Sequence, residues 1–126
     1  MSSILIVDDQ AGIRLLLNEV FQKEGLTTYT ASNGLEGLQI FQEKQLDCIL
    51  LDIKMPGMDG IEILKTIRKT NEYIPVYMMT AYGEQDLIDA ANKLNVVKFF
   101  TKPFNIFEVR DSVLNLLSKS KDVKNT

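Results

Sequence analysis

The chain has very little cysteine and no excess of positive charge. Cys48 is the single cysteine among 126 residues, so no disulfide can form within the chain. Its position inside an apolar run is typical of a small buried hydrophobic side chain. Lys and Arg number 14 against 17 Asp and Glu. The basic surface needed to bind nucleic acid or an anionic membrane is missing, and we expect neither as a partner.

Long apolar runs and low-complexity segments are also absent. The first residues have no basic n-region, and their apolar run is far too short for a signal peptide or a membrane span. We therefore expect a cytoplasmic protein. With 45% apolar residues, a chain of this length can build one complete core and has no room for a second. We expect one domain over residues 1–118, then a polar tail over residues 119–126 that frays, and no output domain.

What the chain does contain is a regular alternation of strand and helix patterns. Strand-like runs occupy residues 4–7, 26–31, 49–52, 75–80 and 96–101. Each is followed by apolar residues at helical spacing: Ile13, Leu16, Leu17, Val20 and Phe21; Leu35, Leu38, Ile40 and Phe41; Ile61, Ile63, Leu64 and Ile67; Leu87, Ile88, Ala90, Ala91 and Leu94; Ile106, Val109, Val113, Leu116 and Leu117.

The ends of these helices carry local signals. Gly25 is placed to end the first helix, and Gly83 to open the fourth. Capping-box spacing occurs three times, in the pairs Asn33 and Glu36, Asp59 and Glu62, and Asn105 and Glu108.

Alternating strands and crossover helices of this length force parallel neighbours on right-handed paths. The sequence therefore predicts an α/β fold with a doubly wound, five-stranded parallel sheet and five helices. We expect the flavodoxin-like strand order 2-1-3-4-5, which places the first and third strands side by side. Asp8, Asp9 and Asp52, at the ends of those two strands, should then lie together.

Three carboxylates at one sheet edge repel one another unless a cation or a lysine neutralises them. Lys102 ends the fifth strand and could reach them. A few oxygen ligands set on loops suit Mg²⁺, for which Mn²⁺ could substitute. The alternative is that Asp8 and Asp9 only stabilise the first helix through its dipole.

A carboxylate beside a divalent cation and a lysine is a plausible nucleophile for phosphoryl transfer, and Asp52 has that position. The Thr80 hydroxyl, at the end of the fourth strand, could donate a hydrogen bond to a phosphoryl oxygen on Asp52, although Thr80 is also an ordinary strand residue. The Lys102-Pro103 bond could be cis, whereas most such bonds are trans.

Four motifs in this order resemble the receiver domain of bacterial two-component response regulators over about residues 3–118. They are Val7-Asp8-Asp9, the stretch from Leu51 to Gly60, Met79-Thr80-Ala81, and Phe100-Thr101-Lys102-Pro103-Phe104. The resemblance implies that Asp52 is the phosphoacceptor, that Asp8 and Asp9 belong to a Mg²⁺ pocket, and that the Lys54 backbone carbonyl is a further ligand. It makes Thr80 the switch hydroxyl, Lys102 a phosphoryl contact and Phe99 the switch aromatic. The turn Met55-Pro56-Gly57 would direct the Lys54 carbonyl to the metal.

A receiver that relays phosphate must expose its aspartate to a phosphohistidine on another protein. The candidate docking residues around Asp52 are Gln10, Gly12, Ile13, Leu16, Lys54, Met55, Tyr82, Gly83, Pro103 and Phe104. An apolar patch there would mark a binding site, although Ile13 and Leu16 could instead belong to the core. Leu15 lies off the core stripe.

The sequence therefore predicts a phosphorelay intermediate. It would accept a phosphoryl group from a sensor histidine kinase onto Asp52 and pass it to a histidine phosphotransferase, with a phosphatase as a third candidate partner. In that limited sense the protein is an enzyme, with slow autodephosphorylation. The alternative within the family is a stand-alone receiver that signals by phosphorylation-dependent binding without onward transfer.

Two other classes fit less well. A haloacid-dehalogenase-like phosphatase expects a second acid two residues after the nucleophile, and that position holds Lys54. An FMN carrier needs a phosphate loop after the first strand, where Asp8 and Asp9 would repel a phosphate.

Overall fold

Five parallel strands form one sheet through the middle of the molecule. The structure is a computed structural model that describes residues 2–81 and 83–124. The strands are β1 (Ser3–Val7), β2 (Thr27–Ala31), β3 (Cys48–Asp52), β4 (Val76–Thr80) and β5 (Lys98–Thr101). Their order is β2-β1-β3-β4-β5, and every pairing is parallel. The predicted fold class and strand order are confirmed.

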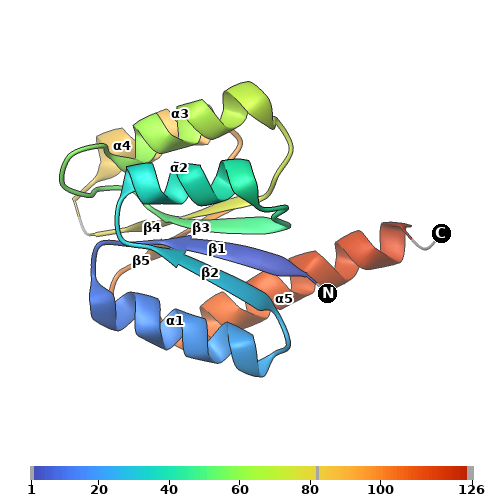
Figure 1. Cartoon of the computed structure of the whole chain (residues 1–126). Helices are drawn as coiled ribbons and strands as arrows, with labels where there is room; N and C mark the ends of the chain where they lie inside the picture. Colours follow the sequence, from blue (N-terminus) through green and yellow to red (C-terminus); the bar gives the residue numbers. More distant parts are fainter. Residues whose placement is uncertain (1, 82, 125–126) are drawn as a thin grey trace.

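The helices cover both faces of this sheet. They are α1 (Ala11–Lys23), α2 (Gly34–Glu43), α3 (Gly60–Thr70), α4 (Gln85–Asn92) and α5 (Ile106–Lys124). Figure 1 shows α1 and α5 on one face and α2, α3 and α4 on the other. Successive strand residues point to opposite faces, so each strand contributes to two cores. On β3, Ile49 and Leu51 pack with α3, whereas Cys48 and Leu50 pack with α1 and α5.

The helix signals in the sequence are borne out at most termini. Asn33 accepts a hydrogen bond from the Glu36 N–H, and Asp59 accepts one from the Glu62 N–H. Gly25 follows the end of α1 with φ +83°, a conformation that glycine adopts without steric cost. At α5 the Asn105 side chain accepts from the Phe107 N–H instead of the predicted Glu108 N–H.

Two helix boundaries differ from the prediction. α4 begins at Gln85, after Gly83, which has φ +91° and therefore lies in the turn; Leu94 falls beyond its last residue. α5 continues to Lys124, past Ser118, where we expected the helix to give way to a frayed tail. Among the described residues, no helix is both long and apolar enough to cross a membrane.

The fifth strand also begins later than predicted, at Lys98 instead of Val96. Asn95 has φ +67°, and the Arg68 guanidinium binds the carbonyls of Leu94 and Asn95 at 2.8 and 3.0 Å. The chain before Lys98 is therefore held in a turn by a residue of α3. A contact between such distant residues left no signal in the local pattern.

Leu35 is not part of the core, contrary to the prediction. Its side chain is 73% exposed, and the buried residues of α2 are Gly34 and Gly37. A Cβ at Gly37 would lie 3.0 Å from the Val7 side chain, so α2 packs closely against β1 through glycine. Periodicity alone could not show this, because glycine does not count as an apolar position.

Candidate functional site

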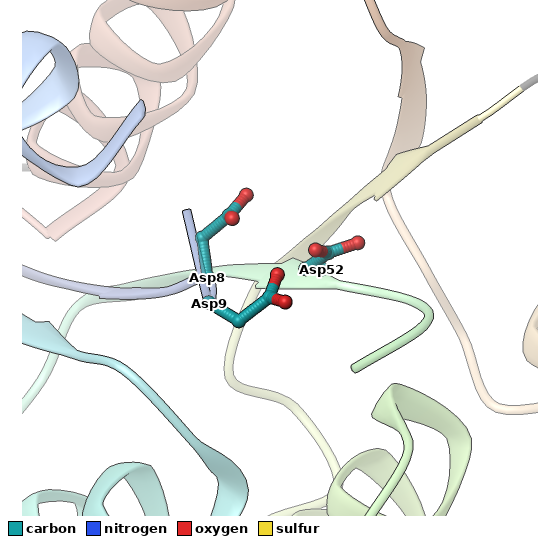
Figure 2. A group of neighbouring side chains, drawn as sticks. All are labelled: Asp8, Asp9 and Asp52. Atoms are coloured by element: carbon teal, nitrogen blue, oxygen red, sulfur yellow. The ribbon is translucent and has the colours of Figure 1, made fainter. Parts of the chain in front are cut away.

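The three predicted carboxylates lie together where β1 and β3 end. Asp8 is fully buried and Asp52 is 6% exposed, whereas Asp9 is exposed. One carboxylate oxygen from each lies within 4.8 Å of the others. Figure 2 shows the Asp9 carboxylate directed toward Asp52. The strand order places them so, because β1 and β3 are neighbours and residues 7 and 51 are paired.

Local hydrogen bonds orient these carboxylates. The Gln10 N–H donates to Asp8 Oδ1 at 2.9 Å, and the Lys54 N–H donates to Asp52 Oδ1 at 3.4 Å. In each case an aspartate accepts from the backbone two residues later, as such residues do in turns. Arg14 Nη1 donates to the Asp8 carbonyl at 2.8 Å, which ties α1 to the end of β1.

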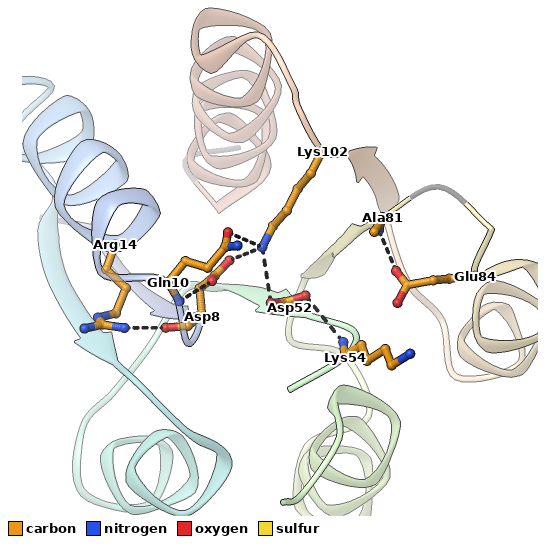
Figure 3. A network of polar contacts seen from close by, with 8 residues as sticks. All are labelled: Asp8, Gln10, Arg14, Asp52, Lys54, Ala81, Glu84 and Lys102. Atoms are coloured by element: carbon orange, nitrogen blue, oxygen red, sulfur yellow. Dashed lines mark hydrogen bonds and ion pairs between the residues drawn. The ribbon is translucent and has the colours of Figure 1, made fainter. Parts of the chain in front are cut away.

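Lys102 reaches the cluster from the end of β5. Its Nζ lies 2.8 Å from Asp8 Oδ2 and 3.2 Å from Asp52 Oδ2, and it donates to Gln10 Oε1 at 3.2 Å (Figure 3). Its backbone N–H donates to the Thr80 carbonyl at 2.6 Å. The peptide bond from Lys102 to Pro103 is cis.

The environment of Asp52 favours its neutral form. Burial, and then the negative charge of Asp8, raise the pKa of Asp52 to about 6, against the smaller opposing effect of Lys102. Burial by itself would lower the pKa of Lys102, but its contacts with Asp8 and Asp52 outweigh that effect and raise it. The site therefore holds more negative charge than one lysine can neutralise.

A divalent cation fits this donor set. Asp8 Oδ2 is buried and, in the part of the chain that the structure describes, has no partner besides the Lys102 ammonium, so it keeps capacity for a ligand. Carboxylate oxygens, few in number and partly open to water, suit Mg²⁺, which retains several of its waters. Asp9, the exposed member, lies on the solvent side of the cluster.

Thr80 lies at the end of β4, next to the strand that carries Asp52. Its Oγ1 is buried and has no hydrogen-bond partner among the described residues. A cavity of about 370 Å³ lies beside it, lined by Ala81, Glu84, Ile88 and Thr101 among others. The Ala81 N–H donates to the Glu84 carboxylate (Figure 3). A buried hydroxyl without a partner is free to donate to an incoming acceptor.

The four motifs are thus gathered at one edge of a receiver-like sheet, and residues 4–114 match the family described as "Response regulator receiver domain". The chain belongs to this receiver family. Over 114 residues it is 55% identical to Sporulation initiation phosphotransferase F of Bacillus subtilis, covering 90% of this chain and 92% of that protein. It is 35% identical to Regulatory protein AtoC of Escherichia coli, covering 98% of this chain but only 28% of that longer protein.

Solved structures place this receiver in the same fold. A receiver domain protein from Clostridium thermocellum has a TM-score of 0.88 and 28% identity, with 98% of this chain and 99% of that one covered. The chemotaxis protein CheY4 of Vibrio cholerae has a TM-score of 0.84 and 27% identity, with 91% and 98% covered.

The sequence also assigned roles to a residue of β5 and to the turn after β3. Phe99, on β5, is partly buried against the core beneath α2, α3 and α4, on the face opposite Phe100. Gly57, in the turn after β3, has φ +86°, and the direction of the Lys54 carbonyl stays a prediction.

The candidate docking residues that the structure describes differ in exposure. Most of them are exposed: Gln10, Gly12, Leu16, Lys54, Gly83 and Pro103. Ile13 and Phe104 are half-buried, and Met55 is buried. Leu15 is exposed, as its position off the core stripe predicted. Tyr82 lies outside the described residues.

Sequence reasoning missed three residues that shape the site. The sequence suggests no separate role for Arg14 and gives Gln10 only a contact with partners, whereas Arg14 binds the Asp8 carbonyl and Gln10 binds Lys102. In the sequence Gly60 is only one member of a motif, but a Cβ there would lie 2.3 Å from the Asp52 carbonyl oxygen. The Asp-Gly pair at the start of α3 was the available signal for Gly60, whereas nothing local pointed to Arg14.

Proposed function

We propose that this receiver is a phosphorelay intermediate in sporulation initiation. It takes a phosphoryl group from a sensor histidine kinase onto Asp52 and passes it to a histidine phosphotransferase. The observation that carries the proposal is the Asp52 carboxylate, which shares the Lys102 ammonium with Asp8 where the parallel strands end. The relay role is supported by 55% identity to Sporulation initiation phosphotransferase F over 92% of its length.

Transfer onto Asp52 is an in-line displacement. An oxygen of Asp52 attacks the phosphorus of a phosphohistidine, a P–O bond forms and the P–N bond breaks. The imidazole nitrogen leaves with the electron pair and takes up a proton from water. Such reactions depend on positioning and on neutralising charge on the phosphoryl oxygens. Lys102 supplies a positive charge beside Asp52, and the Thr80 hydroxyl is free to donate.

Asp8, Asp9, Asp52 and the Lys54 carbonyl are the groups that would hold Mg²⁺, with Mn²⁺ as a substitute. When bound, the cation supplies further neutralisation of the phosphoryl oxygens. The carboxylates of Asp8 and Asp9 lie beside the reacting carboxylate of Asp52.

Onward transfer reverses the chemistry of loading. A histidine nitrogen of the phosphotransferase attacks phosphorus, the P–O bond to Asp52 breaks, and the carboxylate leaves with the electron pair. Slow attack by water in place of histidine gives autodephosphorylation. Exposed residues near Asp52, such as Gln10, Leu16 and Pro103, would contact the kinase, the phosphotransferase and any phosphatase.

Phosphotransfer from a panel of histidine kinases, with radiolabelled phosphate, tests the loading step. Wild type should become labelled with Mg²⁺ present, and Asp52→Ala should not. Asp111→Asn, at an exposed position on α5, is the matched control and should be labelled normally. Labelling of Asp52→Ala at the wild-type rate, or undiminished labelling in EDTA, would contradict the proposal.

A second function is favoured by the structural likeness to a chemotaxis receiver: signalling by phosphorylation-dependent binding, with no onward transfer. Mixing the labelled protein with a candidate histidine phosphotransferase separates the two. Movement of label to the histidine protein supports the relay. Label that stays on Asp52 while binding to a partner strengthens supports the alternative.

A further inference from the structure

Gln10 occupies an unusual place for its residue type. It is the N-cap of α1, with extended backbone angles (φ −88°, ψ 115°), but its side chain makes no capping hydrogen bond. Short polar side chains such as Ser, Thr, Asp and Asn are the good helix caps, so helix capping does not explain why a glutamine stands at this position. Its Oε1 atom instead accepts a hydrogen bond from Lys102 Nζ at 3.2 Å, across 92 positions of sequence (Figure 3).

This contact completes the surroundings of the Lys102 ammonium. An ammonium has three N–H donors, and Nζ has three oxygen neighbours: Asp8 Oδ2, Asp52 Oδ2 and Gln10 Oε1. Two of these oxygens belong to carboxylates with another role in the proposed reaction: Asp52 accepts the phosphoryl group and Asp8 would bind the cation. Gln10 Oε1 is the uncharged one.

Loading of the site therefore weakens two of the three contacts. Asp52 forms a bond to phosphorus, and Asp8 would be a ligand for a divalent cation whose positive charge repels the lysine. A neutral amide oxygen competes poorly with carboxylates for the cation and keeps its lone pairs for Lys102. The backbone of Gln10 is fixed as well, because its N–H donates to Asp8 Oδ1 and its carbonyl accepts from the Arg14 N–H.

We propose that Gln10 is a positioning residue that holds the Lys102 ammonium at the phosphoryl end of the site while Asp8 and Asp52 are engaged. The inference rests on the proposed phosphoryl transfer to Asp52 and gives Gln10 a role within the chain, separate from any contact with a partner. It predicts that Gln10 matters even when no partner protein is present.

A small acyl phosphate as the phosphodonor, with saturating Mg²⁺ and no other protein, provides the test. Gln10→Leu, of similar size but without an acceptor, should label about three- to tenfold more slowly than wild type at saturating donor, which corresponds to one lost hydrogen bond. The donor concentration for half-maximal rate and the calorimetric affinity of the unphosphorylated protein for Mg²⁺ should not change. Gln22→Leu, exposed on the same helix, is the matched control and should label as wild type.

A second measurement does not depend on activity. In the Mg²⁺-saturated protein at low temperature, where Asp8 and Asp52 are engaged by the cation, the Lys102 ammonium should give a slowly exchanging ¹H–¹⁵N signal, lost in Gln10→Leu and retained in Gln10→Glu, which keeps an oxygen in the same place. Loss in both variants, or in neither, overturns the inference. Labelling of Gln10→Leu by the acyl phosphate at the wild-type rate also overturns it. If the rate of transfer from a kinase to that variant fell at the same time, Gln10 would contact partners only. Failure of the proposed function is recognised separately, by labelling of Asp52→Ala.

Discussion

At the scale of single residues, Asp52 carries an unfavourable charge in the metal-free protein. Its pKa is raised to about 6 by burial and by Asp8, so the folded state holds this proton more tightly than the unfolded chain does. The contribution of Asp52 to the free energy of unfolding is therefore most favourable below its unfolded pKa near 3.8. This contribution is lost as the pH rises to about 6.

Replacing Asp52 by its neutral isostere should therefore stabilise the protein. Asp52→Asn is expected to raise the free energy of unfolding by about 1–2 kcal/mol at pH about 7 without metal, and by little at pH about 4. Urea denaturation at both pH values measures this. Asp111→Asn should show no such pH-dependent gain. A loss of stability at neutral pH would mean that the ion pair with Lys102 outweighs the burial of the charge.

At the scale of elements, the turn between β3 and α3 depends on close backbone contact. The Gly60 N–H donates to the Ile53 carbonyl at 2.9 Å, and a Cβ at Gly60 would lie 2.7 Å from Ile53 Cα and 2.3 Å from the Asp52 carbonyl oxygen. These are backbone atoms, which cannot move aside as the end of a side chain can. Gly60 thus allows α3 to begin directly against the strand that carries Asp52.

Gly60→Ala should destabilise the protein by about 1–3 kcal/mol, because the added methyl group forces β3 and α3 apart. Gly12→Ala is the matched control. A Cβ at Gly12 meets nothing within 4 Å, and alanine favours a helix by up to about 1 kcal/mol over glycine, so that variant should be slightly more stable. Thermal unfolding compares them, and equal stability of the two variants would refute the packing argument.

At the scale of the whole molecule, metal binding and folding should be linked. A ligand that binds only the folded state stabilises it by RT ln(1 + [L]/Kd), about 2.7 kcal/mol at a hundredfold excess over Kd. The carboxyl cluster draws its members from the ends of β1 and β3, so the unfolded chain has no comparable site. The unfolding midpoint should rise with the logarithm of the Mg²⁺ concentration.

Asp9 gives this linkage a specific test, because it is exposed and can be changed with little effect on packing. Asp9→Asn should reduce Mg²⁺ affinity about tenfold and so remove about 1.4 kcal/mol of the metal-linked stabilisation at a saturating concentration. Calorimetric titration and melting curves measure both quantities. Asp89→Asn, on the exposed side of α4, should melt as wild type does at every metal concentration. An unchanged metal response in Asp9→Asn would exclude Asp9 as a ligand.

The architecture could be predicted because its determinants are local and repeated. Strands buried on both faces, such as residues 49–52, have a continuous apolar pattern, and crossover helices impose the parallel arrangement. From that order, Asp8, Asp9 and Asp52 had to meet at one edge of the sheet, and Lys102 could reach them from the end of the fifth strand. The sequence by itself therefore determined the fold and the chemical character of the candidate site.

The tertiary structure decided what depends on contacts between distant residues. The Gln10 contact with Lys102, the Arg68 contacts before β5 and the fit of Gly60 against Asp52 join segments whose distances follow from packing. The exposure of Leu35 and the raised pKa of Asp52 have the same origin, since burial belongs to the assembled chain. Periodicity reports which face of an element is apolar, but only the folded chain determines which atoms that face meets.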